Sequence, residues 1–167
     1  GKVEFKHVSF SYTDSRDEMV LEDINFTAEP GQIIGIIGST GSGKTTLVQM
    51  IPRLYDATKG QVLVDGVDVR EYSLKNLREG VGMVLQKNVL FSGTIEENLR
   101  WGKEDASMDE IREMAQSAQA DSFVTSFTNG YDTDMGQGGV NVSGGQKQRL
   151  CIARALLKKP KILILDD

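Results

Sequence analysis

The sequence contains very little cysteine and histidine, and these shortages exclude several kinds of site. Cys151 is the only cysteine among 167 residues, so an internal disulfide or a cysteine metal cluster is excluded. A reducing, cytosolic setting is the simplest interpretation. His7 is the only histidine and is interpreted as a strand residue. No apolar run approaches the roughly 18 residues of a membrane-spanning helix and no signal-peptide pattern is present, so we expect nothing in this chain to cross a membrane by itself.

The chain also lacks an excess of basic residues. Nineteen Lys and Arg stand against twenty-four Asp and Glu, which gives a formal net charge of −5. A protein that grips nucleic acid through a basic face is therefore not expected, and any phosphate site must be local. The length suits one α/β domain that could bury about 70% of its unfolded surface.

The most informative stretch is GSTGSGKT at residues 38–45. It follows the apolar run IIGII at residues 33–37, read as a strand, and precedes TLVQMI at residues 46–51, read as the start of a helix. Strand, glycine-rich loop and helix are the context in which G-x-x-x-x-G-K-T is a phosphate-binding P-loop. The alternative, a glycine turn that happens to contain a lysine, agrees with less of this pattern.

Each residue type in the loop has a physical role in holding phosphate. Gly38, Gly41 and Gly43 allow backbone conformations that a Cβ would forbid, so that successive N–H groups can point at phosphate oxygens. The start of the following helix adds positive dipole. Lys44 can reach the β- and γ-phosphates, and the Thr45 hydroxyl can take one site on an octahedral Mg²⁺.

The residues before the loop are typical of a small antiparallel sheet. Residues 2–8 alternate, and residues 20–28 look like a returning strand. The alternation predicts that one face carries Val3, Phe5 and His7. Tyr12 could stack on a purine, but an aromatic in a half-buried strand is more often part of the core.

After the loop the chain continues with short elements. Residues 61–66 read as a strand that ends in an Asp-Gly turn, and Ser73 can cap a short helix through Arg78. The run VGMVL at residues 81–85 suits a buried parallel strand. Gln86 directly follows this run, and its amide could reach a metal ion or an attacking water. A surface glutamine after a strand is, however, common.

A helical region is expected next. Thr94 with Glu97, and Ser107 with Glu110, have capping-box spacing. Residues 88–102 are unusually apolar for a loop region, so that they either pack inward or dock a partner; the apolar members are Leu90, Phe91, Leu99 and Trp101.

A second glycine-rich stretch, GQGGVNVSGGQ, covers residues 136–146. Ser143 and Gln146 form a further capping box before an amphipathic helix. The Ser143 hydroxyl and the Gly144 and Gly145 N–H groups would face an approaching anion, although the motif alone is only a well-capped helix.

The helix stops near Pro160, and KILIL at residues 161–165 reads as a buried strand that ends in Asp166 and Asp167. Carboxylates at the end of such a strand in a P-loop protein bind Mg²⁺ and position the attacking water.

This set of motifs resembles the nucleotide-binding domain of an ABC transporter, most closely the multidrug and lipid exporter branch. VSGGQKQR at residues 142–149 makes the resemblance specific, and it extends over residues 3–167. It implies an α/β fold: a P-loop NTPase with a RecA-like core, an N-terminal antiparallel β subdomain, an inserted α-helical signature subdomain and a missing C-terminal part. The implied boundaries are about 1–30 for the β subdomain, 31–86 for the core with Walker A, about 87–158 for the helical subdomain and 161–167 for the Walker B strand.

The resemblance also implies roles for individual residues. Asp167 and Gln86 would be catalytic, and the metal would be held by Thr45, Gln86 and Asp166. The nucleotide would be bound by Tyr12, Gly38, Ser39, Thr40, Gly41, Ser42, Gly43, Lys44, Thr45 and Thr46. The γ-phosphate of a partner's ATP would be contacted in trans by Ser143, Gly144, Gly145 and Gln146.

The implied cofactors are ATP and Mg²⁺. The implied partners are a second nucleotide-binding domain, in a homo- or heterodimer, and the transmembrane domains of an exporter, with no nucleic acid. In such a head-to-tail dimer ATP binding closes the interface and hydrolysis reopens it, which drives alternating access at the cytoplasmic face of the membrane. The segment NVLFSGTIEENL resembles the part of an exporter that lies against the membrane domains, and residues 136–141 would lie near the same contact.

The sequence departs from the family pattern in two ways. Asp167 stands where active members have glutamate; losing one methylene withdraws the carboxylate by roughly 1.5 Å, and such a misplacement can cost about 100-fold in rate. This substitution resembles the degenerate half of a heterodimeric exporter, which binds ATP while a partner hydrolyses it. The chain also stops before the D-loop and the switch histidine, which suggests a truncated or processed fragment that exposes apolar surface along residues 162–165.

Three functions remain to be separated. The first is an ATP-hydrolysing motor domain, and the second is the non-hydrolysing half of a heterodimer. The third, a soluble ABC-type ATPase that acts on DNA or ribosomes, is disfavoured by the acidic balance and by the exporter-like segment.

Overall fold

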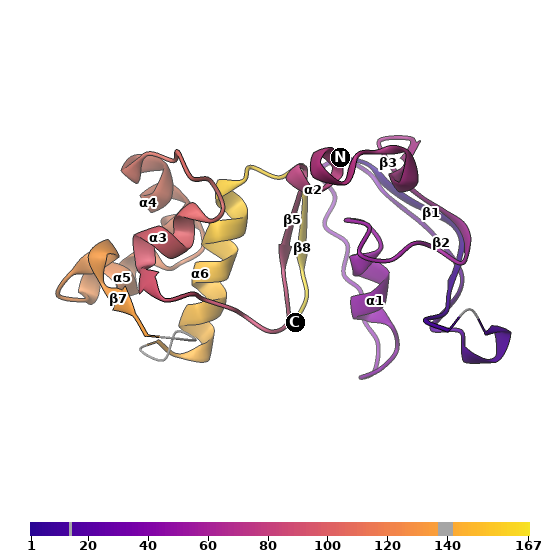
Figure 1. The fold of residues 1–167 in the computed structure, drawn as a ribbon, viewed down its shortest axis with the longest axis horizontal. Coiled ribbons are helices and arrows are strands. Elements are labelled where there is room, and N and C mark those ends of the chain that lie inside the picture. The colour runs from indigo at the N-terminus through magenta and orange to yellow at the C-terminus, as the bar shows by residue number, and fades with distance from the viewer. Residues whose placement is uncertain (14, 137–141) are drawn as a thin grey trace. The chain divides into compact units, whose positions relative to one another are not determined.

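The structure, a computed structural model, describes residues 1–13, 15–136 and 142–167. The chain forms two compact units, Gly1–Val81 and Gly82–Asp167, and each is described by itself. Figure 1 shows an antiparallel sheet with α1 and α2 in the first unit, and the helices α3 to α6 in the second.

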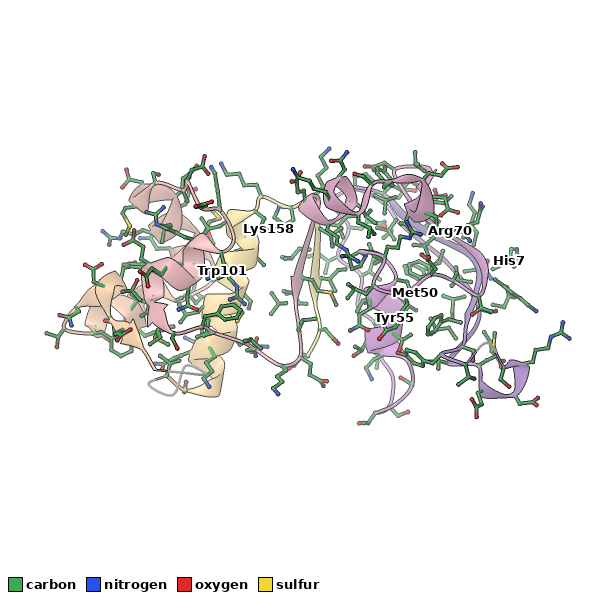
Figure 2. The ribbon with its side chains drawn as sticks, in the orientation of Figure 1. His7, Met50, Tyr55, Arg70, Trp101 and Lys158 are labelled. Carbon is green, nitrogen blue, oxygen red and sulfur yellow. The ribbon has the colours of Figure 1, made fainter. Side chains whose placement is uncertain are left out.

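The first unit is built on a four-stranded sheet whose order is β2-β1-β3-β4. Its strands are β1 (Val3–Phe10), β2 (Leu21–Ala28), β3 (Lys59–Val64) and β4 (Val67–Asp68), and all neighbours are antiparallel. The predicted antiparallel pair is confirmed, but the prediction missed that β3 joins the same sheet. Met50, labelled in Figure 2, follows α1 (Lys44–Gln49) and is fully buried.

The predicted alternation of β1 is wrong beyond Phe5. His7 has a φ of +51°, and the register of β1 shifts at this point against both β2 and β3. Such a bulge adds one residue and reverses the alternation, so Val8 and Phe10 are buried. His7 is a strand residue as expected, but its ring is exposed and its Nδ1 lies 2.7 Å from Oδ1 of Asp23.

Gly60 fits closely against this bulge and gives a stability prediction. A Cβ at Gly60 would collide with the carbonyl oxygens of Lys6 and His7, whereas a Cβ at Gly66 would meet nothing within 4 Å. Both glycines have a φ of +79°, so Gly66→Ala is a matched control for backbone strain. We expect Gly60→Ala to destabilise the protein by about 2 kcal/mol more than Gly66→Ala. Urea unfolding measures the difference, and equal losses would show that the bulge tolerates the added methyl.

The turn and cap signals of the first unit are confirmed. Asp65 and Gly66 both have positive φ and join β3 to β4, as a type I′ hairpin requires. Ser73 caps α2 (Leu74–Glu79) by accepting from the Asn76 N–H at 3.2 Å. Two short 3₁₀ helices, Arg16–Glu18 and Val69–Glu71, complete the unit.

The strand predicted at residues 33–37 is not formed. None of the sheets in the described residues includes this run, and Ile33 and Ile37 are 99% and 98% exposed. Its composition favours a strand, but a strand also needs a neighbour to accept and donate its backbone hydrogen bonds. The composition of a run indicates its preference for strand but not whether a neighbouring strand is available to pair with it.

The second unit combines a strand pair with a set of helices. β5 (Val81–Val84), whose first residue is the last of the first unit, pairs with β8 (Ile162–Leu165), and Figure 1 shows both running in the same direction. Its other elements are α3 (Ile95–Arg100), α4 (Met108–Ser117), α5 (Asp121–Ser126), a 3₁₀ turn (Gly130–Asp132), α6 (Gly144–Leu157) and the short pair β6 (Gly93–Thr94) and β7 (Asp134–Met135). All three predicted capping boxes are present. Within the described residues, no helix has the length and apolar character needed to cross a membrane.

The helices share one core, whose fully buried members include Ile95, Leu99, Ile111, Met135 and Leu150. β8 differs from its prediction as a buried strand, because only Ile164 is buried while Leu163 and Leu165 are 41% and 58% exposed. β5 is its one neighbour among the described strands. The expected exposure of apolar side chains along residues 162–165 is therefore present at Leu163 and Leu165.

Candidate functional site

The glycine-rich loop of the first unit has the backbone that its sequence predicts. Gly41 and Gly43 have φ of +79° and +90°, a region that side chains with a Cβ rarely adopt. A Cβ on Gly38 would lie 2.5 Å from Oγ of Ser42, and the Ser42 N–H donates to the Ser39 carbonyl at 3.1 Å. Residues 38–42 are all exposed, so the tight loop is open to a ligand.

Lys44 is the first residue of α1, and its side chain turns back over the loop. Its ammonium donates to the carbonyls of Gly38 at 2.8 Å and of Ser39 at 2.9 Å. A mobile cation held at the loop by neutral carbonyls can exchange these contacts for charge-assisted ones to an anion. Thr45 follows on the same turn and is half-buried.

Tyr12 lies against the helix that follows the loop. Its hydroxyl is 2.7 Å from Oγ1 of Thr46, and its ring packs edge-on with Phe10 at 4.8 Å and with Tyr55 at 5.2 Å between ring centroids. The side chain is nevertheless 55% exposed. The structure thus contradicts the core interpretation of Tyr12 and leaves ring surface available for stacking.

The second unit carries the other predicted residues in two places. Gln86 follows β5 and Asp166 follows β8, and the Asp166 N–H donates to the Val84 carbonyl at 2.9 Å. Gln86, Asp166 and Asp167 therefore lie at the carboxyl-terminal edge of the strand pair, with Gln86 and Asp167 exposed. Among residues 1–13, 15–136 and 142–167, no three His, Cys, Asp or Glu side chains form a metal cluster.

The other place is the start of α6. Gln146 N–H donates to Oγ of Ser143 at 3.2 Å, and the Ser143 N–H donates to Oε1 of Gln146 at 3.0 Å. This box leaves Ser143, Gly144 and Gly145 exposed, and a Cβ on either glycine would meet nothing within 4 Å. The preceding residues 137–141, most of the predicted partner-facing loop, lie outside the described residues.

Cys151 has no part in such chemistry. It is buried in the helical core, and burial raises the pKa of its thiol, with the Arg154 cation opposing the shift. A protonated, covered thiol is a weak nucleophile.

The family profile for ABC transporters matches residues 21–167. The chain belongs to the ABC transporter family. An ABC transporter ATP-binding protein of Bacillus subtilis, YfiB, is 52% identical over all 167 residues, and the putative multidrug export ATP-binding/permease protein YgaD of the same organism is 50% identical. ABC transporter B family member 13 of Arabidopsis thaliana is 48% identical over the same span.

Solved structures agree with this assignment. A bacterial Atm1-family ABC exporter with ATP bound matches 99% of the chain with a TM-score of 0.92 and 38% identity. The chain spans 29% of the length of each Bacillus relative, 13% of the Arabidopsis relative and 28% of the solved exporter. This ABC domain thus has a mixed α/β fold that matches the corresponding part of an Atm1-family exporter.

The sequence did not single out Tyr55. Tyr55 follows α1 in a loop without periodicity, so only its ring contact with Tyr12 relates it to the candidate site. A second tyrosine shortly after the P-loop helix was the one available signal.

Proposed function

We propose that this domain is the ATP-binding motor of an exporter, which binds and hydrolyses MgATP to drive efflux of a drug or lipid-like substrate. The observation that carries the proposal is the loop at residues 38–45, whose Lys44 ammonium lies over the loop carbonyls. The similarity to YgaD, a putative multidrug export ATP-binding/permease protein, supports the same function.

The residues proposed to hold the phosphates and the metal are chosen by the hydrogen-bond donors and oxygen ligands that they offer. Gly38, Ser39, Thr40, Gly41, Ser42 and Gly43 would cradle the phosphates with Lys44 and Thr46. Mg²⁺ would be held by Thr45, Gln86 and Asp166, since this ion favours oxygen ligands and takes the rest from water and phosphate. It would neutralise charge that develops on the phosphates. Asp167 would orient the attacking water and accept its proton.

We propose a second nucleotide-binding domain as the first partner, in a homo- or heterodimer. Ser143, Gly144 and Gly145 are exposed at the start of a 14-residue helix, which suits contact with the γ-phosphate of an ATP held by the other domain. Gln146 completes the box that holds Ser143 in place. ATP would close this dimer, and hydrolysis would reopen it.

The transmembrane domains of the exporter are the second partner. Within residues 88–102, Leu90 and Leu99 are buried, while Phe91 and Trp101 are 44% and 70% exposed. The two exposed rings lie 5.1 Å apart, and the Arg154 guanidinium lies 5.9 Å from the Phe91 ring centre. Part of the segment thus packs inward, and another part leaves aromatic rings free to dock a partner. The exposed rings support docking at the cytoplasmic face of the membrane.

The finer architecture belongs to the same proposal. α3 to α6 would form the signature subdomain. The domain boundaries at about 30, 86, 158 and 161 remain predictions.

Base recognition by Tyr12 tests this function directly. Tyr12→Ala should weaken MgATP binding by about 1 kcal/mol, the scale of an aromatic pair. Inorganic tripolyphosphate, which has no base, should bind as before. Titration calorimetry on the full-length protein compares the two ligands, and Tyr12→Phe, which keeps the ring, serves as the control. Equal losses for both ligands would remove Tyr12 from the nucleotide site.

A further inference from the structure

Three aromatic rings meet where β1 ends and the chain leaves α1. Phe10 is the last residue of β1, Tyr12 follows two positions later, and Tyr55 (labelled in Figure 2) comes from the loop after α1. Tyr55 is nearly perpendicular to Tyr12, at 87° and 5.2 Å, and lies 5.5 Å from Phe10 at a tilt of 50°. These are distances and angles of attractive aromatic pairs.

The loop that carries Tyr55 is fastened to the segment that carries Tyr12. The Thr58 N–H donates to the Ser9 carbonyl at 2.9 Å, and Oγ1 of Thr58 accepts from the Ser11 N–H at 3.2 Å. Arg53 and Asp56 bridge the loop itself, with Nε 2.7 Å from Oδ1. Tyr55 is thus a fixed neighbour of Tyr12.

Tyr12 needs such a neighbour because so much of it is exposed. A ring that is 55% exposed and follows the end of a strand can rotate unless contacts fix it. The hydroxyl contact with Thr46 fixes one end of the ring, and the perpendicular contacts with Phe10 and Tyr55 fix its plane. A ring already held in position loses less conformational entropy when a base stacks on it.

We propose that Tyr55 is a positioning residue for purine recognition: it holds the Tyr12 ring for stacking without contacting the base. This inference rests on the proposed function, because it presumes that Tyr12 stacks on the base of a nucleoside triphosphate. Tyr55 then contributes to the choice of a nucleotide over a bare polyphosphate.

The test compares ligands and variants in the full-length protein. Tyr55→Ala should weaken MgATP binding about threefold and leave inorganic tripolyphosphate unchanged. Tyr55→Phe keeps the ring and should bind MgATP like the native protein. Leu54→Ala, at the neighbouring exposed side chain, is the matched control and should change neither ligand. Tyr55→Leu repeats the test with apolar bulk retained, in case the alanine variant does not fold.

A double-mutant cycle separates positioning from direct contact. If Tyr55 acts only through Tyr12, then Tyr55→Ala should weaken MgATP binding no further in a Tyr12→Ala background. Additive losses would show that Tyr55 contacts the base itself, and equal losses for ATP and tripolyphosphate would show a merely structural role; either result overturns the proposal. Failure of the proposed function looks different, because Tyr12→Ala would then leave the preference for ATP over tripolyphosphate unchanged.

Discussion

Lys44→Ala should reduce the affinity for MgATP and for inorganic tripolyphosphate by about 100-fold or more, which amounts to loss of binding at ordinary concentrations. The Lys44 ammonium already lies at 2.8 and 2.9 Å from two loop carbonyls, at the place where phosphate oxygens would arrive. Its removal leaves a loop of neutral N–H groups to hold several negative charges. Calorimetric titration of the full-length protein with each ligand measures the loss.

Lys75→Ala is the matched control for this prediction. Lys75 is exposed on α2, in the same unit, and its substitution changes the net charge equally. It should leave both affinities unchanged. Tight MgATP binding retained by Lys44→Ala would refute the assignment of the loop.

Asp167→Glu should raise steady-state ATP turnover by about 100-fold, because the added methylene moves the carboxylate by roughly 1.5 Å toward the attacking water. Asp167 directly follows Asp166 at the edge of the β5–β8 pair and is exposed. The affinity for MgATP should change little, since this carboxylate acts on the water. Phosphate release by the full-length protein, with its partner domain present, measures the rate.

Asp167→Asn is the companion variant, since it keeps the size of the side chain and removes the basic oxygen. It should turn over more slowly than the native protein. Equal rates for native and Asp167→Glu proteins would show that aspartate suffices as the base. A native protein that binds ATP without hydrolysing it, and gains turnover with glutamate, would identify a degenerate half that depends on a partner for hydrolysis.

The features that the sequence predicts correctly are fixed by residues close together in the chain. Each capping box depends on two residues three positions apart, and the Asp65–Gly66 turn depends on two neighbours with positive φ. The tight backbone of the glycine-rich loop is equally local, since Gly41 and Gly43 within it both take positive φ. In each case the residues that interact all lie within the local pattern itself.

The features that the sequence misses depend on distant partners. The bulge at His7 is matched by Gly60, which lies on another strand, so alternation within β1 could not reveal it. The run at residues 33–37 has strand composition, but pairing decides whether a strand forms. Tyr55 gains its place from the fold of a loop that carries no periodic signal.

Steady-state MgATP hydrolysis by the full-length protein in lipid vesicles is the decisive test of the proposed motor function. We expect saturable, Mg²⁺-dependent phosphate release that Lys44→Ala abolishes and Lys75→Ala preserves. Hydrolysis that persists in Lys44→Ala, or a native protein that releases no phosphate from MgATP whether or not it binds the nucleotide, would contradict the proposed motor function.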